Sequence, residues 1–381
     1  MSPKLTADLR FRTAPGQSVA VTSPYDHLDA RHFWRLAIAE VEPLQWRGLY
    51  EKRFALEPGA QIATAGSCFA QHIGRQLKRR GFGFLDLEPA PPSLSAQRHT
   101  EFGYGLFSAR YGNIYTARQL LQLVKEAFKE SRPRERIWPS GGRFFDPFRP
   151  SVEPNGFASP EELLALRQLV LLPAVREVLA RCDVFVFTLG LTEAWISRLD
   201  GAVFPACPGT VAGEFDAARH AFHNFGFEET YADMVAFIER LRSINPGAKV
   251  LLTVSPVPLT ATAGGQHVLV STTYSKSVLR AVAGALYQRF DFVDYFPSYE
   301  IVTAPAMGGA LYAPDKRNVT AAGVEHVMSH FFVEHAAEGG FEAREPDQAG
   351  SARAPYDADH AAELEEFRAV CDEEKLDPAL R

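Results

Sequence analysis

Cys68 is the first residue whose type and surroundings suit chemistry. The apolar run Gln61-Ile-Ala-Thr-Ala predicts a buried strand, Gly66 follows at once, and a helical pattern continues to Arg80. Because Gly66 allows a sharp turn, we expect Cys68 near the N-terminus of that helix. The N–H groups there favour a thiolate and can hold an oxyanion, which suits a nucleophile. The same position also suits a small buried thiol that only packs between helix and strand.

Strand-like and helix-like segments alternate through the rest of the chain. We expect further strands at 82–87, 183–189, 249–254 and 290–295, and helices at 159–181 with a kink at Pro173, 231–244, 275–289 and 321–333. This alternation predicts an α/β fold, a three-layer α/β/α sandwich with a parallel sheet. Ligands of such folds bind beyond the carboxyl ends of the strands, where Cys68 is expected.

Four sequence blocks carry a resemblance to a known family. The run Ile62-Ala-Thr-Ala-Gly-Ser-Cys-Phe-Ala resembles the signature of the GSCFA domain family, a branch of the SGNH/GDSL hydrolase superfamily. Gly112-Asn113, Gly190-Leu-Thr-Glu193 and Asp315-Lys-Arg-Asn318 are similar to the later blocks of that superfamily. The resemblance covers about residues 20 to 335, and it implies an SGNH hydrolase-like, flavodoxin-like arrangement of the sheet.

The resemblance also implies roles for individual residues. The superfamily's serine nucleophile falls on Cys68, and the residue before it on Ser67. Its oxyanion donors would be the N–H groups of Cys68 and Gly112 and the hydroxyl of Thr192. The remaining block residues are candidates for substrate binding: Asn113, Gly190, Glu193 and Asn318. Glu193 could equally be a surface or capping carboxylate. No metal and no cofactor is expected.

The sequence departs from the superfamily at Asn318, where the catalytic histidine is expected. A cysteine tolerates this loss better than a serine, because its ordinary pKa of about 8.5 already leaves a few per cent thiolate at neutral pH. Two histidines are candidate replacement bases. His72 lies one helical turn after Cys68, and His326 lies in the closing helix close to Asp315, which could orient a base or cap that helix. Each could also be a packing or surface residue.

Composition limits the remaining possibilities. Residues 338–381 carry a net charge of −8, which leaves +2 for the rest of a chain whose formal net charge is −6. This balance argues against a nucleic-acid partner. No apolar run approaches the roughly 20 residues of a membrane span, and no secretion signal is evident, so we expect a cytoplasmic protein. The four cysteines lack paired spacing, which argues against a disulfide scaffold.

Three regions are expected along the chain: an N-terminal extension at 1–58, the α/β domain at 59–335 with an insertion around 132–157, and an acidic linker and helix at 336–381. The final helix, at 359–374, could dock a protein partner or a second copy. The function expected from these features is acyl hydrolysis or acyl transfer on an ester or thioester, with acylated carbohydrate as one substrate class. The alternative is a binding protein of the same fold that has lost its base.

Overall fold

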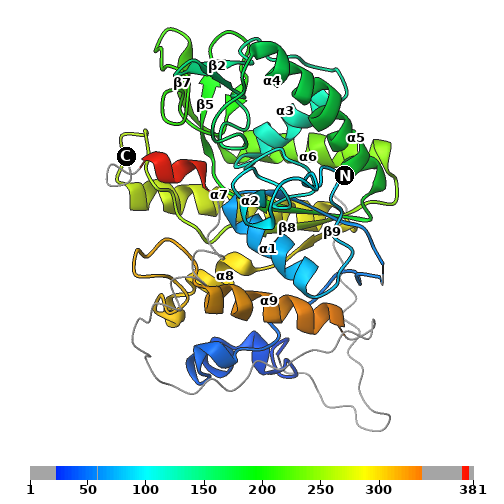
Figure 1. Cartoon of the computed structure of the whole chain (residues 1–381). Coiled ribbons are helices and arrows are strands. Elements are labelled where there is room, and N and C mark those ends of the chain that lie inside the picture. Colours follow the sequence, from blue (N-terminus) through cyan, green and yellow to red (C-terminus); the bar gives the residue numbers. More distant parts are fainter. Residues whose placement is uncertain (1–22, 58, 337–370, 377–381) are drawn as a thin grey trace, which may run out of the picture. The chain divides into compact units, whose positions relative to one another are not determined.

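The structure is a computed structural model that describes residues 23–57, 59–336 and 371–376 (Figure 1). The chain divides into two compact units, with the boundary between Trp46 and Arg47. The described part of the first unit forms three short helical turns, η1 (Ala30–His32), η2 (Arg35–Ala39) and η3 (Pro43–Gln45). Tyr50 already belongs to the second unit, because its hydroxyl donates a 2.8 Å hydrogen bond to Asp294. This boundary therefore lies earlier than the expected one at 58.

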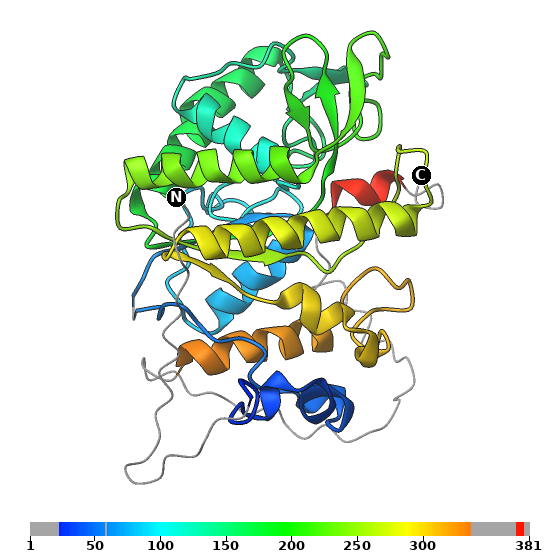
Figure 2. The same cartoon turned by 180° about the vertical axis from the view of Figure 1, so that it is seen from behind.

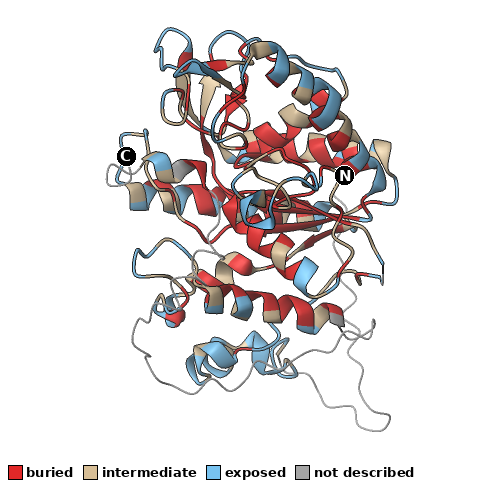
Figure 3. Ribbon diagram, in the orientation of Figure 1, coloured by how far each residue is buried: buried red, intermediate tan, exposed pale blue. Residues whose placement is uncertain are grey.

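A parallel sheet forms the centre of the second unit. Its strands lie in the order β1 (Ile62–Gly66), β4 (Val184–Leu189), β8 (Lys249–Val254) and β9 (Val293–Tyr295). Every residue of β1 and β4 is buried, which accounts for their continuous apolar sequences (Figure 3).

The strand expected at 82–87 is reduced to one parallel bridge between Phe84 and Ile62. The segment cannot continue beside β1, because the Leu87 N–H donates to the carbonyl of Ser108 instead. With Phe84 counted as a minimal strand, the order becomes the flavodoxin-like 2-1-3-4-5. The topological switch point, where ligands bind in such sheets, then falls between β1 and β4.

Helices cover both faces of the sheet, which confirms the predicted three-layer α/β/α sandwich (Figures 1 and 2). One face carries α1 (Cys68–Arg79), α8 (Ser298–Thr303) and α9 (Ala321–Ala336). The other carries α3 (Ala117–Ala127), α5 (Leu172–Arg181), α6 (Phe227–Ile244) and α7 (Val268–Arg289). The helix expected to kink at Pro173 runs as α4 (Pro160–Leu166), a π-helical segment η4 (Arg167–Leu171) and α5. Pro173 falls in the first turn of α5, where its missing N–H costs little.

Several elements were not predicted. An antiparallel sheet orders β6 (Val203–Phe204), β5 (Glu193–Ser197) and β7 (His220–Asn224). The insertion contains the hairpin β2 (Trp138–Ser140) and β3 (Arg143–Phe145), and a short helix, α2, spans Ala96–His99. Aromatic contacts join the hairpin to the antiparallel sheet; for example, the ring centroids of Trp138 and Phe204 lie 5.2 Å apart.

The described C-terminal residues form a short 3-10 helix, η6 (Asp372–Leu376, red in Figures 1 and 2). The expected linker and most of the expected acidic helix lie at 337–370, outside the described residues. Among the described helices, none combines the length and apolar character that a membrane crossing requires.

Candidate functional site

The turn between β1 and α1 requires glycine at position 66. Gly66 has φ +138°, and a Cβ placed there would lie 2.5 Å from the carbonyl oxygen of Thr188 in β4. The N–H of Ser67 donates to that same carbonyl at 3.2 Å. Ser67 then caps α1, and Cys68 is the first residue of the helix, with 5% of its surface exposed. The thiol therefore lies at the positive end of a helix and at the switch point of the sheet.

Backbone hydrogen bonds join this turn to the two other glycine-containing loops. The N–H of Ile114 donates to the carbonyl of Gly66 at 2.8 Å, and the N–H of Gly190 donates to the carbonyl of Tyr115 at 3.1 Å. A Cβ on Gly190 would lie 2.7 Å from the Cβ of Ser67. The structure thus brings together the Ser67–Cys68, Gly112–Asn113 and Gly190 segments that the sequence singled out.

The segment Cys371–Asp372 packs into this junction from the far end of the sequence. The Asp372 carboxylate accepts hydrogen bonds from Asn113 Nδ2 at 3.0 Å and from Tyr115 Oη at 3.4 Å, and the Asp372 N–H donates to Tyr115 Oη at 3.0 Å. Cys371 Sγ accepts from Arg317 Nη2 at 3.3 Å and lies 3.7 Å from Tyr115 Oη. The Cys371 thiol, the Arg317 guanidinium and the Asp372 carboxylate therefore meet around Tyr115 and Asn113.

The electrostatics of the site favour a thiolate. A hydrogen bond from Cys68, together with the charge and hydrogen bond of Arg317, lowers the pKa of Cys371 to about 6 against the opposing effect of burial. Burial without such partners has the reverse effect, since it raises the pKa of Cys182 to about 12. Two contacting thiols titrate as a pair, so we assign the single negative charge near neutral pH to both sulfur atoms together.

The two histidines proposed as bases pack against other aromatic rings. Neither His72 nor His326 makes a side-chain hydrogen bond with any described residue, Cys68 included. His72 packs against Phe69, and burial together with Arg75 lowers its pKa to about 3, which makes it a poor proton acceptor. His326 packs against His330 with ring centroids 5.0 Å apart, and burial lowers its pKa. The helical spacing of His72 from Cys68 did not bring their polar atoms together.

Asp315 and Asn318 form a closed turn on the surface. Asp315 accepts hydrogen bonds from the backbone N–H groups of Arg317 and Asn318 and from Asn318 Nδ2. These bonds lower the pKa of Asp315, although its partial burial alone would raise it. Both side chains are exposed. Of the two residues between them, Arg317 is the one that donates a hydrogen bond to the Cys371 thiol.

Thr192 and Glu193 also have partners of their own. The Thr192 hydroxyl donates to Asn224 Oδ1 at 2.6 Å, so its only hydrogen is already used and it cannot serve as the expected oxyanion donor in this arrangement. Glu193 lies in β5 and accepts from the Thr262 hydroxyl at 2.8 Å. Burial raises the pKa of Glu193. We therefore place neither side chain at the reacting centre.

Three buried polar atoms at this junction have no hydrogen-bond partner among the residues that the structure describes: Ser67 Oγ, Thr188 Oγ1 and Asp372 Oδ1. A buried polar atom left unpaired costs roughly 1–3 kcal/mol, and such atoms gather at functional sites. A cavity of about 20 Å³, close to the size of one water molecule, is bordered by Gly112, Asn113 and Asp372. A much larger hollow of about 610 Å³ lies along α7. Its lining includes none of the thiols, so we place the site at the junction instead.

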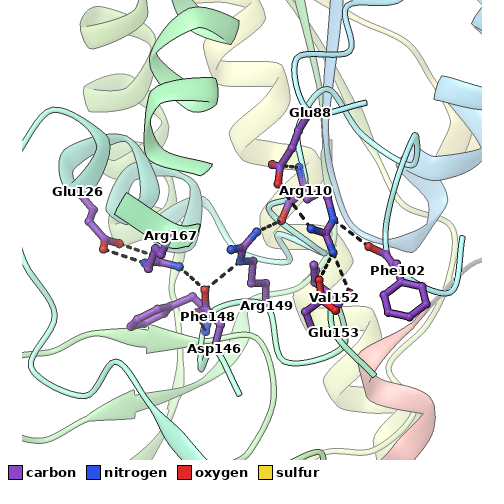
Figure 4. A network of polar contacts seen from close by, with 10 residues as sticks. All are labelled: Glu88, Phe102, Arg110, Glu126, Asp146, Phe148, Arg149, Val152, Glu153 and Arg167. Carbon is purple, nitrogen blue, oxygen red and sulfur yellow. Dashed lines mark hydrogen bonds and ion pairs between the residues drawn. The ribbon is translucent and has the colours of Figure 1, made fainter. Parts of the chain in front are cut away.

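Buried ion pairs lie beside the Gly112–Asn113 loop, and Figure 4 shows the arginines and carboxylates that form them. Arg149 donates to the carbonyl of Arg110 at 2.8 Å and to Asp146 at 2.9 Å. Arg167 joins Asp146 to Glu126. Gly112 has φ +71°, and a Cβ there would lie 3.1 Å from the Cβ of Arg149. The insertion therefore braces the loop that carries Asn113.

Sequence reasoning missed four residues of the site: Tyr115, Arg317, Cys371 and Asp372. Tyr115 and Arg317 lie within or beside blocks that the sequence singled out, but only for the neighbouring Asn113 and Asn318. Cys371 was one of four scattered thiols, in a segment expected to bind a partner. No local pattern relates it to Cys68.

Comparison with known proteins gives a family. The GSCFA family model matches residues 61–331. Three solved structures share 11% sequence identity with the chain. A carbohydrate esterase of family 3 from Talaromyces cellulolyticus has a TM-score of 0.33, with 71% of this chain and 94% of that chain covered. An acetyl esterase mutant with an acetate ion has a TM-score of 0.31, with 71% of this chain and 93% of that chain covered. A protein described as a GDSL-like lipase, from Parabacteroides merdae, has a TM-score of 0.30, with 74% of this chain and 97% of that chain covered. No curated protein matches the chain significantly.

Proposed function

Since the chain belongs to the GSCFA family, and its Cys68 begins α1 at the switch point of the sheet, we propose that it transfers acyl groups with Cys68 as the nucleophile. The reaction would be hydrolysis of an ester or thioester, or transfer of the acyl group to another acceptor. The observation that carries this proposal is the place of Cys68 as the first residue of α1 directly after the tight Gly66 turn, because the positive end of a helix favours the reactive thiolate.

We assign the role of proton acceptor to Cys371. The two hydrogen-bonded sulfur atoms share one negative charge, and passage of the proton from Cys68 to Cys371 leaves the thiolate on Cys68. That thiolate attacks the acyl carbonyl and forms a tetrahedral oxyanion. Collapse of the oxyanion expels the alcohol or thiol, and water or an acceptor hydroxyl then releases the acyl group.

Asn113 is the side-chain donor we assign to the oxyanion, in place of Thr192. Its Nδ2 atom already donates to a negatively charged oxygen, that of Asp372, at 3.0 Å. The N–H groups of Cys68 and Gly112 complete the set proposed from the family resemblance. Asp372 occupies the position of a substrate oxygen, so a substrate has only to displace one side chain from Asn113 and Tyr115.

A small acylated substrate, such as an acylated carbohydrate or a thioester, fits this proposal. Arg317 would tolerate an anionic group near the thiols, since it is the cation that faces them. The GSCFA family assignment itself does not name the acyl group.

Turnover of model substrates tests the proposal. We expect wild-type protein to hydrolyse p-nitrophenyl acetate or a short acyl thioester, and Cys68→Ala to lose at least about a thousandfold in kcat/KM. Cys182→Ser is the matched control, since Cys182 is a buried thiol outside the site. Equal activities of wild type and Cys68→Ala, or no activity above the uncatalysed rate, would overturn the proposal.

A binding protein of the same fold is the second candidate. The observation in its favour is that the Asp372 carboxylate already occupies Asn113 Nδ2 and Tyr115 Oη, two donors that a substrate oxygen would use. This candidate predicts that acyl compounds or carboxylates bind without turnover. Binding by calorimetry combined with absent hydrolysis would select it.

A further inference from the structure

We propose that Gln71 is a positioning residue of the candidate site, which holds the side-chain amide of Asn113 so that the amide nitrogen, rather than the amide oxygen, faces the ligand. The orientation rests on hydrogen bonds between described residues, whereas its effect on catalysis rests on the proposed function. The orientation also sets the class of ligand. An amide nitrogen only donates hydrogen bonds, so it recognises a carbonyl or carboxylate oxygen.

Two hydrogen bonds fix the direction of the Asn113 amide. Gln71 Nε2 donates to Asn113 Oδ1 at 3.0 Å, and Asn113 Nδ2 donates to Asp372 Oδ2 at 3.0 Å. Gln71 is fully buried and Asn113 is 4% exposed, so bulk water does not compete for either end of the amide. Each end of the Asn113 amide therefore has the kind of partner that its chemistry requires.

A rotation of the Asn113 amide by half a turn would reverse both contacts. Its nitrogen would then face the amide nitrogen of Gln71, and its oxygen would face the carboxylate of Asp372, which when ionised only accepts hydrogen bonds. Two favourable bonds would become two contacts between like groups in a buried place, where unmet hydrogen-bonding groups are costly. When a substrate displaces Asp372, the bond from Gln71 remains and keeps the amide nitrogen directed at the substrate.

The place of Gln71 in the fold connects this amide to the nucleophile. Gln71 lies in α1 three residues after Cys68, so both lie on one face of the same helix. Asn113 belongs to a loop that is joined to the turn before this helix, because the N–H of Ile114 donates to the carbonyl of Gly66 at 2.8 Å. One backbone bond and one side-chain bond therefore restrain the Asn113 amide relative to the nucleophile.

A second buried glutamine of α1 provides the contrast. Gln76 is 2% exposed, and its Nε2 atom donates to Glu325 Oε1 at 3.4 Å. Glu325 lies in α9, and 49% of its side chain is exposed. Gln76 thus shares the residue type, the helix and the burial of Gln71, but its partner is a surface carboxylate rather than a residue of the site. It is the matched control.

Steady-state kinetics of full-length variants tests the role in catalysis. Gln71→Met keeps the approximate size of the side chain and removes its donor, so the Asn113 amide is free to turn either way. Loss of one oxyanion donor lowers kcat by about 10²–10³, so a donor that is misdirected most of the time should lower kcat for p-nitrophenyl acetate about tenfold. KM should change less than about threefold. Gln76→Met should match wild type.

A pH profile separates orientation from packing. In Gln71→Glu, an ionised carboxylate cannot donate to Asn113 Oδ1, whereas a protonated carboxyl can. Burial raises the pKa of such a carboxyl above its ordinary value of about 4.3, so a lower pH restores the donor. We expect the ratio of variant to wild-type kcat/KM to rise about tenfold between about pH 8 and pH 5, while the ratio for Gln71→Met stays constant.

Other titrating groups near position 71 do not produce this change in the ratio. Among the described residues, the charged ones that border the same cavity as Gln71 and Asn113 are Arg149 and Asp372. Wild type and variant both contain these groups and the Cys68 thiol, so the titration of these groups cancels in the ratio.

A double-mutant cycle in urea unfolding tests the orientation without any substrate. If Gln71 directs the Asn113 amide at Asp372, loss of the Gln71 donor should matter less once Asp372 has been removed. We expect Gln71→Met to lower the urea midpoint less than about half as much in an Asp372→Ala background as in wild type. Gln76→Met should lower the midpoint equally in both backgrounds.

Three results would overturn the proposal: equal midpoint losses for Gln71→Met in the two backgrounds, equal kcat for Gln71→Met and Gln76→Met, or a Gln71→Glu ratio that does not change with pH. Failure of the proposed function gives a different pattern, in which wild-type protein has no acyl activity and the urea cycle alone decides. If thermal unfolding shows that Gln71→Glu does not fold, the kinetics of Gln71→Met and the urea cycle decide instead.

Discussion

Two polar clusters flank the Gly112–Asn113 loop, and they differ in how completely their groups are paired. On one side, Arg167 bonds to Glu126 and Asp146, and Arg149 bonds to Asp146 and to the carbonyl of Arg110 (Figure 4). Although burial alone would raise the pKa of Asp146, the charges of Arg167 and Arg149 lower it. Each buried carboxylate in this ionic network faces a guanidinium.

On the other side, the thiol cluster of Cys68, Tyr115, Arg317, Cys371 and Asp372 contains more acceptors than one guanidinium can satisfy. Within the described part of the chain, the buried atoms Asp372 Oδ1 and Ser67 Oγ have no hydrogen-bond partner. A fully paired network makes a loop rigid, whereas an incompletely paired one can exchange a partner for a ligand. We therefore assign the ionic network to support and the thiol cluster to chemistry.

The largest predicted effect comes from breaking the ionic network. Arg167→Met would leave Glu126 and Asp146 buried without their shared partner, so we expect the free energy of unfolding to fall by about 3–5 kcal/mol. Urea unfolding followed by circular dichroism measures it. Arg240→Met, which removes a partly exposed pair with Glu130, should cost less than about 1 kcal/mol. A similar loss in the free energy of unfolding for both variants would mean that the buried ionic network stabilises the fold no more than a partly exposed ion pair does.

The turn beside the thiol cluster is the next target. Gly66→Ala would combine a strained φ of +138° with a clash against the carbonyl of Thr188. We therefore expect the free energy of unfolding to fall by about 3 kcal/mol and acyl-transfer activity to be lost. Gly265→Ala is the control, because a Cβ there meets nothing within 4 Å and its φ is not positive. A stable, active Gly66→Ala protein would show that the tight approach of β1 to β4 is dispensable.

The helix that carries Cys68 also holds a buried titratable group with no compensating charge. Burial lowers the pKa of His72 to about 3, so below its ordinary value of 6.5 the unfolded chain binds a proton that the folded protein excludes. Stability therefore falls as the pH drops from 6.5 towards 3. Between pH 7 and pH 5 this one group should cost about 2 kcal/mol.

Denaturant midpoints at pH 7 and pH 5 check this prediction. His72→Gln should lose correspondingly less stability over that interval, while substitution of the exposed His27 should leave the difference unchanged. An identical pH dependence in His72→Gln and wild type would mean that His72 does not titrate as described.

The smallest predicted effect concerns Asp372 within the thiol cluster. Asp372→Ala removes the carboxylate that occupies Asn113 Nδ2 and Tyr115 Oη, so we expect KM for a neutral ester to fall a few-fold, which corresponds to about 1 kcal/mol. Steady-state kinetics measures KM, with Lys375→Ala, an exposed residue of the same helix η6, as control. A raised KM in Asp372→Ala would show that the carboxylate assists the substrate rather than competing with it.

The architecture could be predicted because it rests on local patterns. Continuous apolar runs identified β1, β4 and β8, since strands buried on both faces need them, and the Gly66 turn followed from a strand that meets a helix without a linker. The strands outside the centre of the parallel sheet were harder to predict from the sequence. The strand expected at 82–87 did not form beyond Phe84, because the N–H of Leu87 donates to the carbonyl of Ser108 instead of to β1. Strands β5 and β7 were not predicted, because polar and apolar residues do not alternate in their sequences.

The site was predictable only in part, for the same reason. Glycine positions and the nucleophile lie in short motifs, and the structure brings those motifs together through backbone hydrogen bonds. The proton-handling partners do not lie in motifs. His72 has the right helical spacing from Cys68 but packs against Phe69, because spacing along a helix does not determine which neighbour fills the space beside it.

By itself, the sequence determined that this chain is an α/β protein of the GSCFA family with Cys68 at a strand-to-helix turn, because these properties depend on residues close together in the chain. Only the tertiary structure decided which groups gather at the loops beside that turn. Arg317, Cys371 and Asp372 meet around Tyr115 and Asn113 from segments remote in sequence, and long-range contacts follow from how the whole chain packs rather than from any local pattern.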